Sequence, residues 1–98
     1  MNSYMVDIDL PAEPTPEFMN LIPYQRAYIT RMMKKGSIEN YSLSFNRQKL
    51  WVVVNAESSF EVRQIISAFP IFNYIRFDVH NLLFHDTNSI TSPQLWLN

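Results

Sequence analysis

Alternating apolar and polar residues mark the strands of this chain. Residues 75–80 alternate strictly, and residues 4–10 and 37–45 do so over most of their length. Because successive side chains of a strand point to opposite faces of a sheet, each segment predicts a strand with one buried and one polar face. Residues 50–54 are apolar throughout, as in a central strand, and the polar segment 46–49 predicts a turn that joins them to residues 37–45 as a hairpin.

A first helix is predicted between Thr15 and Gly36. Thr15 can cap it, Pro16 suits the first helical position, and Gly36 suits the left-handed residue after the helix. Pro23 removes a backbone hydrogen bond inside it, which predicts a kink or a break near residues 19–21. One broad stripe at helical spacing forms its buried face: Phe18, Leu21, Ile22, Gln25, Tyr28, Ile29 and Met32.

A second, shorter helix is predicted between Ser58 and Pro70. Ser58 followed three residues later by Glu61 is a capping box, and Pro70 ends the helix. The side chains expected on its buried face are Phe60, Ile65 or Ile66, and Phe69.

The resulting order is β-α-β-β-α-β, the ferredoxin-like α+β arrangement. It predicts a four-stranded antiparallel sheet with both helices on one face. The other face is left open to water, to a ligand or to a second subunit. We expect residues 1–98 to form one domain. The tail, residues 86–98, lacks periodicity but contains Leu95, Trp96 and Leu97, so we expect it to pack on the domain or on a neighbouring subunit.

The amino-acid composition limits the kinds of partner that the protein is expected to bind. The chain of 98 residues is 47% apolar and 14% aromatic, more than one small core needs, which favours self-association. A net charge of -1 gives no electrostatic footprint for nucleic acid or an anionic membrane. No apolar run approaches the roughly 20 residues of a membrane span, and the first residues do not resemble a signal peptide. With no cysteine in the sequence, a cytoplasmic location is the expectation.

The open face of the predicted sheet gathers most of the ionisable residues. Its polar positions are Asp7, Asp9, Asn40, Ser42, Ser44, Arg76, Asp78 and His80. The first and last strands are neighbours in this fold, so Asp7 and Asp9 are predicted partners of Arg76 and His80. A carboxylate beside an imidazole can act as a general acid–base pair near neutral pH. Ion pairing that merely stabilises neighbouring strands explains the same pattern.

Other candidates also have two interpretations. His85 and Asp86 form either a histidine–carboxylate pair that acts as a general base or a polar pair at a strand end. They could also be half of a metal site, but two histidines without cysteine disfavour one. Tyr24 and Tyr28 either bind a ligand hydroxyl or pack in the core. A single glycine leaves no glycine-rich nucleotide-binding loop, so we predict no cofactor.

Around Pro70, at the end of the second predicted helix, the chain resembles a known family. Residues 69–74, Phe-Pro-Ile-Phe-Asn-Tyr, are similar to the Leu-Pro-Leu-Phe-Pro-Tyr segment of the muconolactone isomerase-like proteins. The helix end at Lys35-Gly36 and the helix start at Ser58 also carry the resemblance, and Val79, Leu82, His85 and Ser89-Ile90 keep step with the family without gaps. The resemblance implies a homodimeric α+β barrel, in which the open sheet faces of two protomers pack together, and rings of such dimers. It also implies isomerisation of a small unsaturated lactone by movement of a proton next to a carbonyl.

The resemblance carries over unevenly to single residues. The family's proton-transfer glutamate falls on Gln25, and a Trp-Arg pair of its second strand falls on Ser42-Leu43, whereas His85 matches. Two functions therefore stand as hypotheses. The first is a non-catalytic barrel protein that assembles with itself and binds a small apolar or lactone-like ligand, or none. The second is an isomerase that uses His80 or His85 with Asp78. The ligand-binding candidates are Tyr24, Gln25, Tyr28, Arg76 and Ser42.

Overall fold

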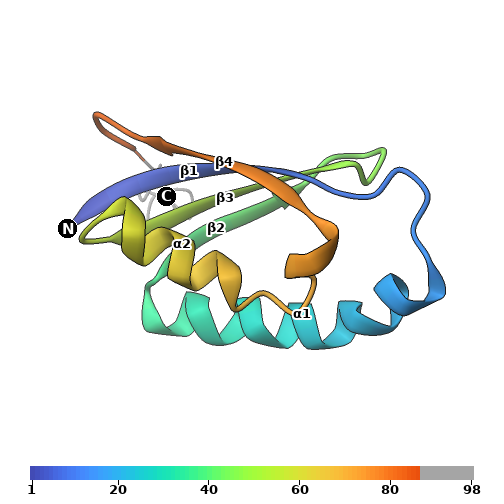
Figure 1. Cartoon of the computed structure of the whole chain (residues 1–98). Helices are drawn as coiled ribbons and strands as arrows, with labels where there is room; N and C mark the ends of the chain where they lie inside the picture. Colours follow the sequence, from blue (N-terminus) through green and yellow to red (C-terminus); the bar gives the residue numbers. More distant parts are fainter. Residues whose placement is uncertain (87–98) are drawn as a thin grey trace, which may run out of the picture.

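Residues 1–86, which the computed structural model describes, form one sheet with two helices on the same side of it (Figure 1). The elements are β1 (Asn2–Asp9), α1 (Pro16–Lys35), β2 (Ile38–Leu43), β3 (Lys49–Ala56), α2 (Ser59–Ser67), the 3-10 turn η1 (Phe72–Tyr74) and β4 (Arg76–Asn81). The strands lie in the order β2-β3-β1-β4, and every pair is antiparallel. The predicted ferredoxin-like order is confirmed.

Strand register separates the two faces of the sheet. Val6 of β1 lies opposite Val52 of β3 and Val79 of β4, and all three belong to the core beneath the helices. The alternate positions, such as Asp7, turn to the other side, which we call the open face. Within β3, Val53 on the open face is as fully buried as its neighbours, which agrees with the predicted apolar central strand.

Helix α1 begins and ends where the sequence predicts. The Thr15 hydroxyl accepts a hydrogen bond from the Phe18 N–H at 3.2 Å, and Gly36 adopts a φ of 82° after the last turn. The predicted break near residues 19–21 is wrong, because the helix runs through Pro23 without interruption, whereas the alternative of a kink stays a prediction. Pro23 and Met19, whose carbonyl loses its partner, are both exposed, so water can satisfy that carbonyl while the buried stripe holds the helix on either side.

Helix α2 also has its predicted cap. The Ser58 hydroxyl accepts from the Glu61 N–H at 3.3 Å. Val62, Ile66 and Phe69 are buried, but Phe60 is 69% exposed, so its predicted place on the buried face is wrong. The buried residues recur at intervals of three and four, and Phe60 is two positions from Val62, which turns it to the other side of the helix.

The chain after β4 turns back toward the far edge of the sheet. The Leu82 N–H donates to the Ser3 carbonyl at 2.9 Å, and His85 reaches Glu39 of β2, two strands beyond β1. The predicted packing of Leu95, Trp96 and Leu97 lies outside the described residues. Neither α1 nor α2 is long and apolar enough to cross a membrane.

Candidate functional site

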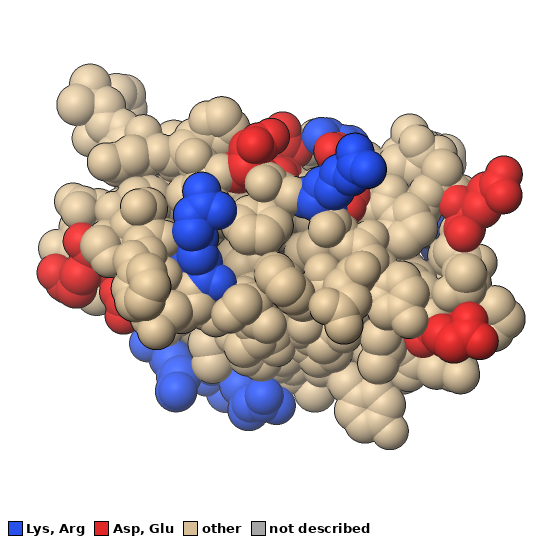
Figure 2. Space-filling view, in the orientation of Figure 1, with Lys and Arg blue, Asp and Glu red and all other residues tan. Residues whose placement is uncertain are grey.

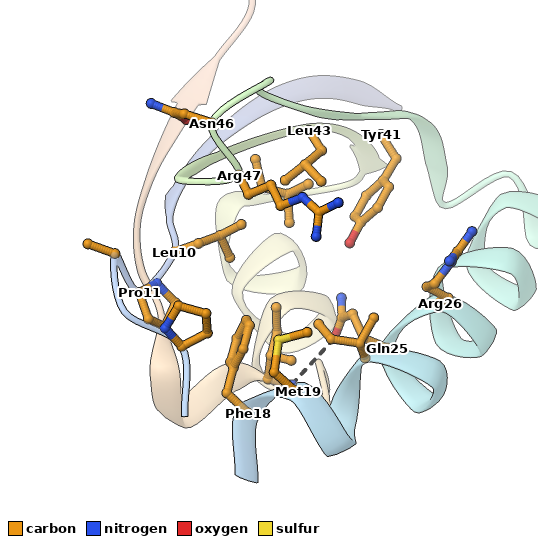
Figure 3. Close-up of a pocket in the computed structure, with 15 residues that line it drawn as sticks. Leu10, Pro11, Phe18, Met19, Gln25, Arg26, Tyr41, Leu43, Asn46 and Arg47 are labelled. Atoms are coloured by element: carbon orange, nitrogen blue, oxygen red, sulfur yellow. Dashed lines mark hydrogen bonds between the residues drawn. The ribbon is translucent and has the colours of Figure 1, made fainter. Parts of the chain in front are cut away.

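A pocket opens among the described residues on the helix-covered side of the sheet (Figure 3). It lies between the first half of α1, the loop before it and the β2–β3 hairpin, and it has a volume of about 610 Å³. Small-molecule sites commonly have this size and a mostly apolar lining. We call it the Gln25 pocket. Its lining residues are Leu10, Pro11, Ala12, Pro14, Phe18, Met19, Ile22, Gln25, Arg26, Tyr41, Leu43, Asn46, Arg47, Leu50 and Ile71.

Gln25 is the buried polar side chain of this pocket. It is 1% exposed, and its Oε1 accepts a hydrogen bond from the Ile71 backbone N–H at 3.4 Å. Only the oxygen of an amide can accept, so this bond fixes which end faces Ile71. The other end, Nε2, faces the Tyr41 hydroxyl across the pocket (Figure 3), and this contact lowers the pKa of Tyr41 but falls short of a well-formed hydrogen bond. A buried donor with so weak a partner is costly, and it commonly marks a place that a ligand or water occupies.

Tyr41 keeps its proton at neutral pH. Burial raises the pKa of its hydroxyl above the ordinary tyrosine value, and the nearby Gln25 amide and the Arg26 charge only partly oppose this rise. The hydroxyl points toward the Gln25 side chain (Figure 3). Tyr41 therefore contributes a neutral hydroxyl to the pocket, not a phenolate.

Two guanidinium groups stand at the mouth of the pocket. Arg26 comes from α1, and Arg47 comes from the β2–β3 hairpin, where it adopts a φ of 63°. Figure 3 shows the Arg47 guanidinium turned toward the Tyr41 hydroxyl. Within residues 1–86 neither arginine forms an ion pair. The described lining contains no aspartate, glutamate or histidine, so its ionisable side chains are Tyr41 and these two arginines.

The candidates Asp78, His80, Arg76 and Ser42 lie elsewhere. All are exposed at the edge strands, and none lines the pocket. In the register of β1 and β4, Arg76 lies opposite Asp9 as predicted, whereas His80 lies opposite Met5 and Asp78 opposite Asp7. The predicted pairing of His80 with Asp7 or Asp9 is therefore wrong, because Asp7 lies two residues along β1 from the position opposite His80.

The ion pairs of the open face involve a residue that the sequence reasoning assigned to a turn. The Lys49 ammonium lies 2.9 Å from Asp7 Oδ1 and 2.6 Å from Asp9 Oδ1. Hydrogen bonds to Asp7 and Asp9 raise the pKa of Lys49. Lys49 is the first residue of β3 and lies directly opposite Asp9. A predicted strand that began at residue 49 instead of 50 would have revealed the pair.

His85 pairs with Glu39 at 2.9 Å, a contact that the sequence reasoning missed in favour of Asp86. The Glu39 carboxylate also accepts from the Asn55 amide at 3.4 Å, and Asn55 in turn accepts from the Ser3 hydroxyl at 3.0 Å. These groups come from four separate segments, which no local spacing could reveal. Among residues 1–86 no group of three or more potential metal ligands gathers.

The two tyrosines of α1 have different places. Tyr24 is 68% exposed, and Tyr28 is 8% exposed. The Tyr28 hydroxyl donates to the Ile65 carbonyl at 2.8 Å, so it ties α1 to α2 inside the core. Neither tyrosine lines the pocket, and ligand binding by them stays a prediction.

Two comparisons with known proteins found matches. The model of the family described as muconolactone delta-isomerase matches residues 3–88. A crystal structure of muconolactone isomerase superimposes with a TM-score of 0.70 at 19% identity, covering 92% of this chain and 96% of that chain. This identity shows a shared fold. No curated protein sequence matches. With a family match over most of its length, the chain belongs to the muconolactone delta-isomerase family.

Proposed function

We propose that this protein is a non-catalytic member of its family that binds a small ligand in the Gln25 pocket. One observation carries the proposal: the buried polar group of the pocket is the amide of Gln25. Moving a proton next to a carbonyl needs a base that can give and take a proton near the working pH, and an amide cannot do so.

The remaining polar lining supports the same proposal. Burial keeps the Tyr41 hydroxyl protonated by raising its pKa, and an arginine side chain does not lose its proton in a protein. The described lining thus supplies apolar walls and hydrogen-bond donors without a base. Such a pocket can hold a small molecule but gives it no path for proton transfer.

Deuterium incorporation tests this proposal. The protein is incubated with muconolactone in D2O, and NMR follows both ligand binding and exchange next to the carbonyl. We expect saturable binding with no exchange above the buffer rate. A Gln25→Glu variant is the matched comparison, because it adds a carboxyl whose pKa burial should raise, and we expect it to gain exchange. Exchange by the unmodified protein, or no binding by it, contradicts the proposal.

An isomerase is the second candidate, and the His85–Glu39 contact of 2.9 Å favours it. A carboxylate that orients an imidazole is a common arrangement for a general base. His80 and Asp78 are exposed, and neither forms an ion pair within residues 1–86. If the unmodified protein does exchange the proton, a His85→Gln variant that loses this exchange and a His80→Gln variant that keeps it would identify His85 as the base.

The proposal includes a homodimer through the open face. This face has Trp51, 37% exposed, beside side chains of both charges, including Asp78 and Arg76, that a two-fold copy can pair. Beyond β4, Leu83 and Phe84 are 97% and 71% exposed, which is costly for a monomer. Light scattering coupled to size exclusion should give a dimer or a multiple of it, and a monomer at micromolar concentration contradicts this part of the proposal.

A further inference from the structure

We propose that Met19 is an oxidation site, at which hydrogen peroxide lowers the affinity of the Gln25 pocket for its ligand. This inference rests on the proposed function, since it requires that the pocket binds a ligand. It adds a regulation of that site, through conversion of the Met19 thioether to a sulfoxide.

The sulfur chemistry of the chain gives the first argument. Peroxides react readily with thiolates and with thioethers, and the sequence contains five methionines and no cysteine. Methionine is therefore the sulfur that an oxidant meets. Met1, Met19 and Met33 are exposed. Met5 and Met32 are half-buried. Because oxidation follows exposure, the first three are the expected targets.

The position of Met19 gives the second argument. Met19 is 47% exposed and lines the Gln25 pocket, whereas Met33, at 44% exposed, lies outside the lining. Figure 3 shows the Met19 side chain extending from α1 into the pocket. Ile22, three residues later and so on the same face of the helix, lines the pocket as well. The Met19 side chain is thus both open to water and part of the surface that meets a ligand.

The oxidation itself needs only the peroxide. Hydrogen peroxide transfers one oxygen atom to the Met19 sulfur: the O–O bond breaks, an S–O bond forms, and the peroxide leaves as water. The sulfur loses two electrons and becomes a sulfoxide. A methionine sulfoxide reductase removes the oxygen again, with thiols as the source of electrons, so the change is reversible.

The apolar lining gives the third argument, because it makes the sulfoxide unfavourable there. Phe18, Ile22 and Leu50 line the pocket beside the flexible, apolar thioether of Met19, which can follow the shape of a ligand. A sulfoxide is polar, and an apolar ligand that covers it removes its water without replacing the lost hydrogen bonds. Met19 lies outside the core cluster, so its oxidation weakens binding and leaves the fold intact.

Oxidation of matched variants tests the inference. The protein is treated with hydrogen peroxide, peptide mass spectrometry locates the added oxygen, and muconolactone is titrated before and after. We expect the oxidised protein to bind about tenfold more weakly and to recover after treatment with the reductase. Met33→Leu, which removes an equally exposed methionine of α1, should show the same loss on oxidation. Met19→Leu should bind equally before and after the treatment.

A second variant tests the site without any oxidant. Met19→Gln places a polar group of similar length in the pocket, so it should bind muconolactone about tenfold more weakly than the unmodified protein, with an unchanged melting temperature.

Each outcome of these titrations has one meaning. Unchanged binding with Met19 fully oxidised overturns the inference and leaves the proposed ligand site standing. A loss that persists in Met19→Leu also overturns it, because another methionine would then be responsible. If the untreated protein does not bind muconolactone up to millimolar concentration, the proposed function fails together with the inference.

Discussion

The two faces of the sheet use polar residues in opposite ways. On the open face charges are numerous and exposed, and those that pair do so with each other, as Lys49 does with Asp7 and Asp9. On the helix-covered face one buried amide, Gln25, stands among apolar side chains with its Nε2 only weakly paired, toward the Tyr41 hydroxyl. Figure 2 shows charged side chains of both signs scattered over a largely uncharged surface, without a continuous basic patch. Under the proposed function, a dense cluster of surface charges is thus a weaker sign of a ligand site than a single buried amide in a cavity.

The difference between the faces should be largest in stability. Ile8 is fully buried under the helices, and Asp9, the next residue of β1, turns to the open face. Ile8→Ala should lower the free energy of unfolding by about 3 kcal/mol, because it removes core volume. Urea denaturation measures it.

Asp9→Ala is the matched control on the same strand. It should cost far less, because Asp9 is a surface partner of Lys49 and exposed ion pairs contribute little. Equal losses in the two variants would show that the open face carries as much of the folding energy as the core.

Gln25 should have the next largest effect. Gln25→Met keeps the approximate volume of the side chain but leaves the Ile71 N–H without its acceptor, which should cost about 2 kcal/mol. Tyr24→Met changes the neighbouring, exposed residue of α1 and should be close to neutral. Thermal denaturation of both variants checks the difference. An unchanged melting temperature of Gln25→Met would mean that the hydrogen bond from the Ile71 N–H to Gln25 does not stabilise the fold.

Tyr41 should have the smallest effect, and only at high pH. Its folded pKa is raised above the ordinary value of 10.0, so above about pH 10 the folded state binds more protons than the unfolded state and stability falls as the pH rises. Tyr41→Phe should make this fall shallower, by less than the about 1.4 kcal/mol per pH unit of a full proton. Tyr28, whose pKa burial also raises, stays in the variant and keeps part of the slope. Unfolding measured between pH 9 and 11 tests this, and an unchanged slope contradicts the burial of Tyr41.

The sequence predicted the fold better than the site, for physical reasons. Periodicity and caps such as Thr15 and Ser58 are local, so they located the strands, the helices and the buried stripe that includes Gln25. The pocket arises only when that stripe meets the β2–β3 hairpin, where Arg47 enters it at a positive φ that no spacing indicates. The contact between His85 and Glu39 likewise joins segments far apart in the chain.

Sequence reasoning favoured the open face because charges are visible in a pattern. A buried amide within an apolar stripe is easily taken for core. Its one distinguishing signal was that Gln25 is the only polar residue of that stripe, in a helix whose other buried positions are apolar or aromatic.

The most direct test of the account is an NMR titration that observes the Gln25 side-chain amide. With muconolactone added to isotope-labelled protein, the account predicts that the Gln25 Nε2 protons and the Ile71 amide proton shift in a saturable way. Signals of His80 and Asp78 on the open face should stay in place. Saturable shifts at His80, Asp78 or His85 without any at Gln25 and Ile71 would contradict it, because the ligand would then bind on the other side of the sheet.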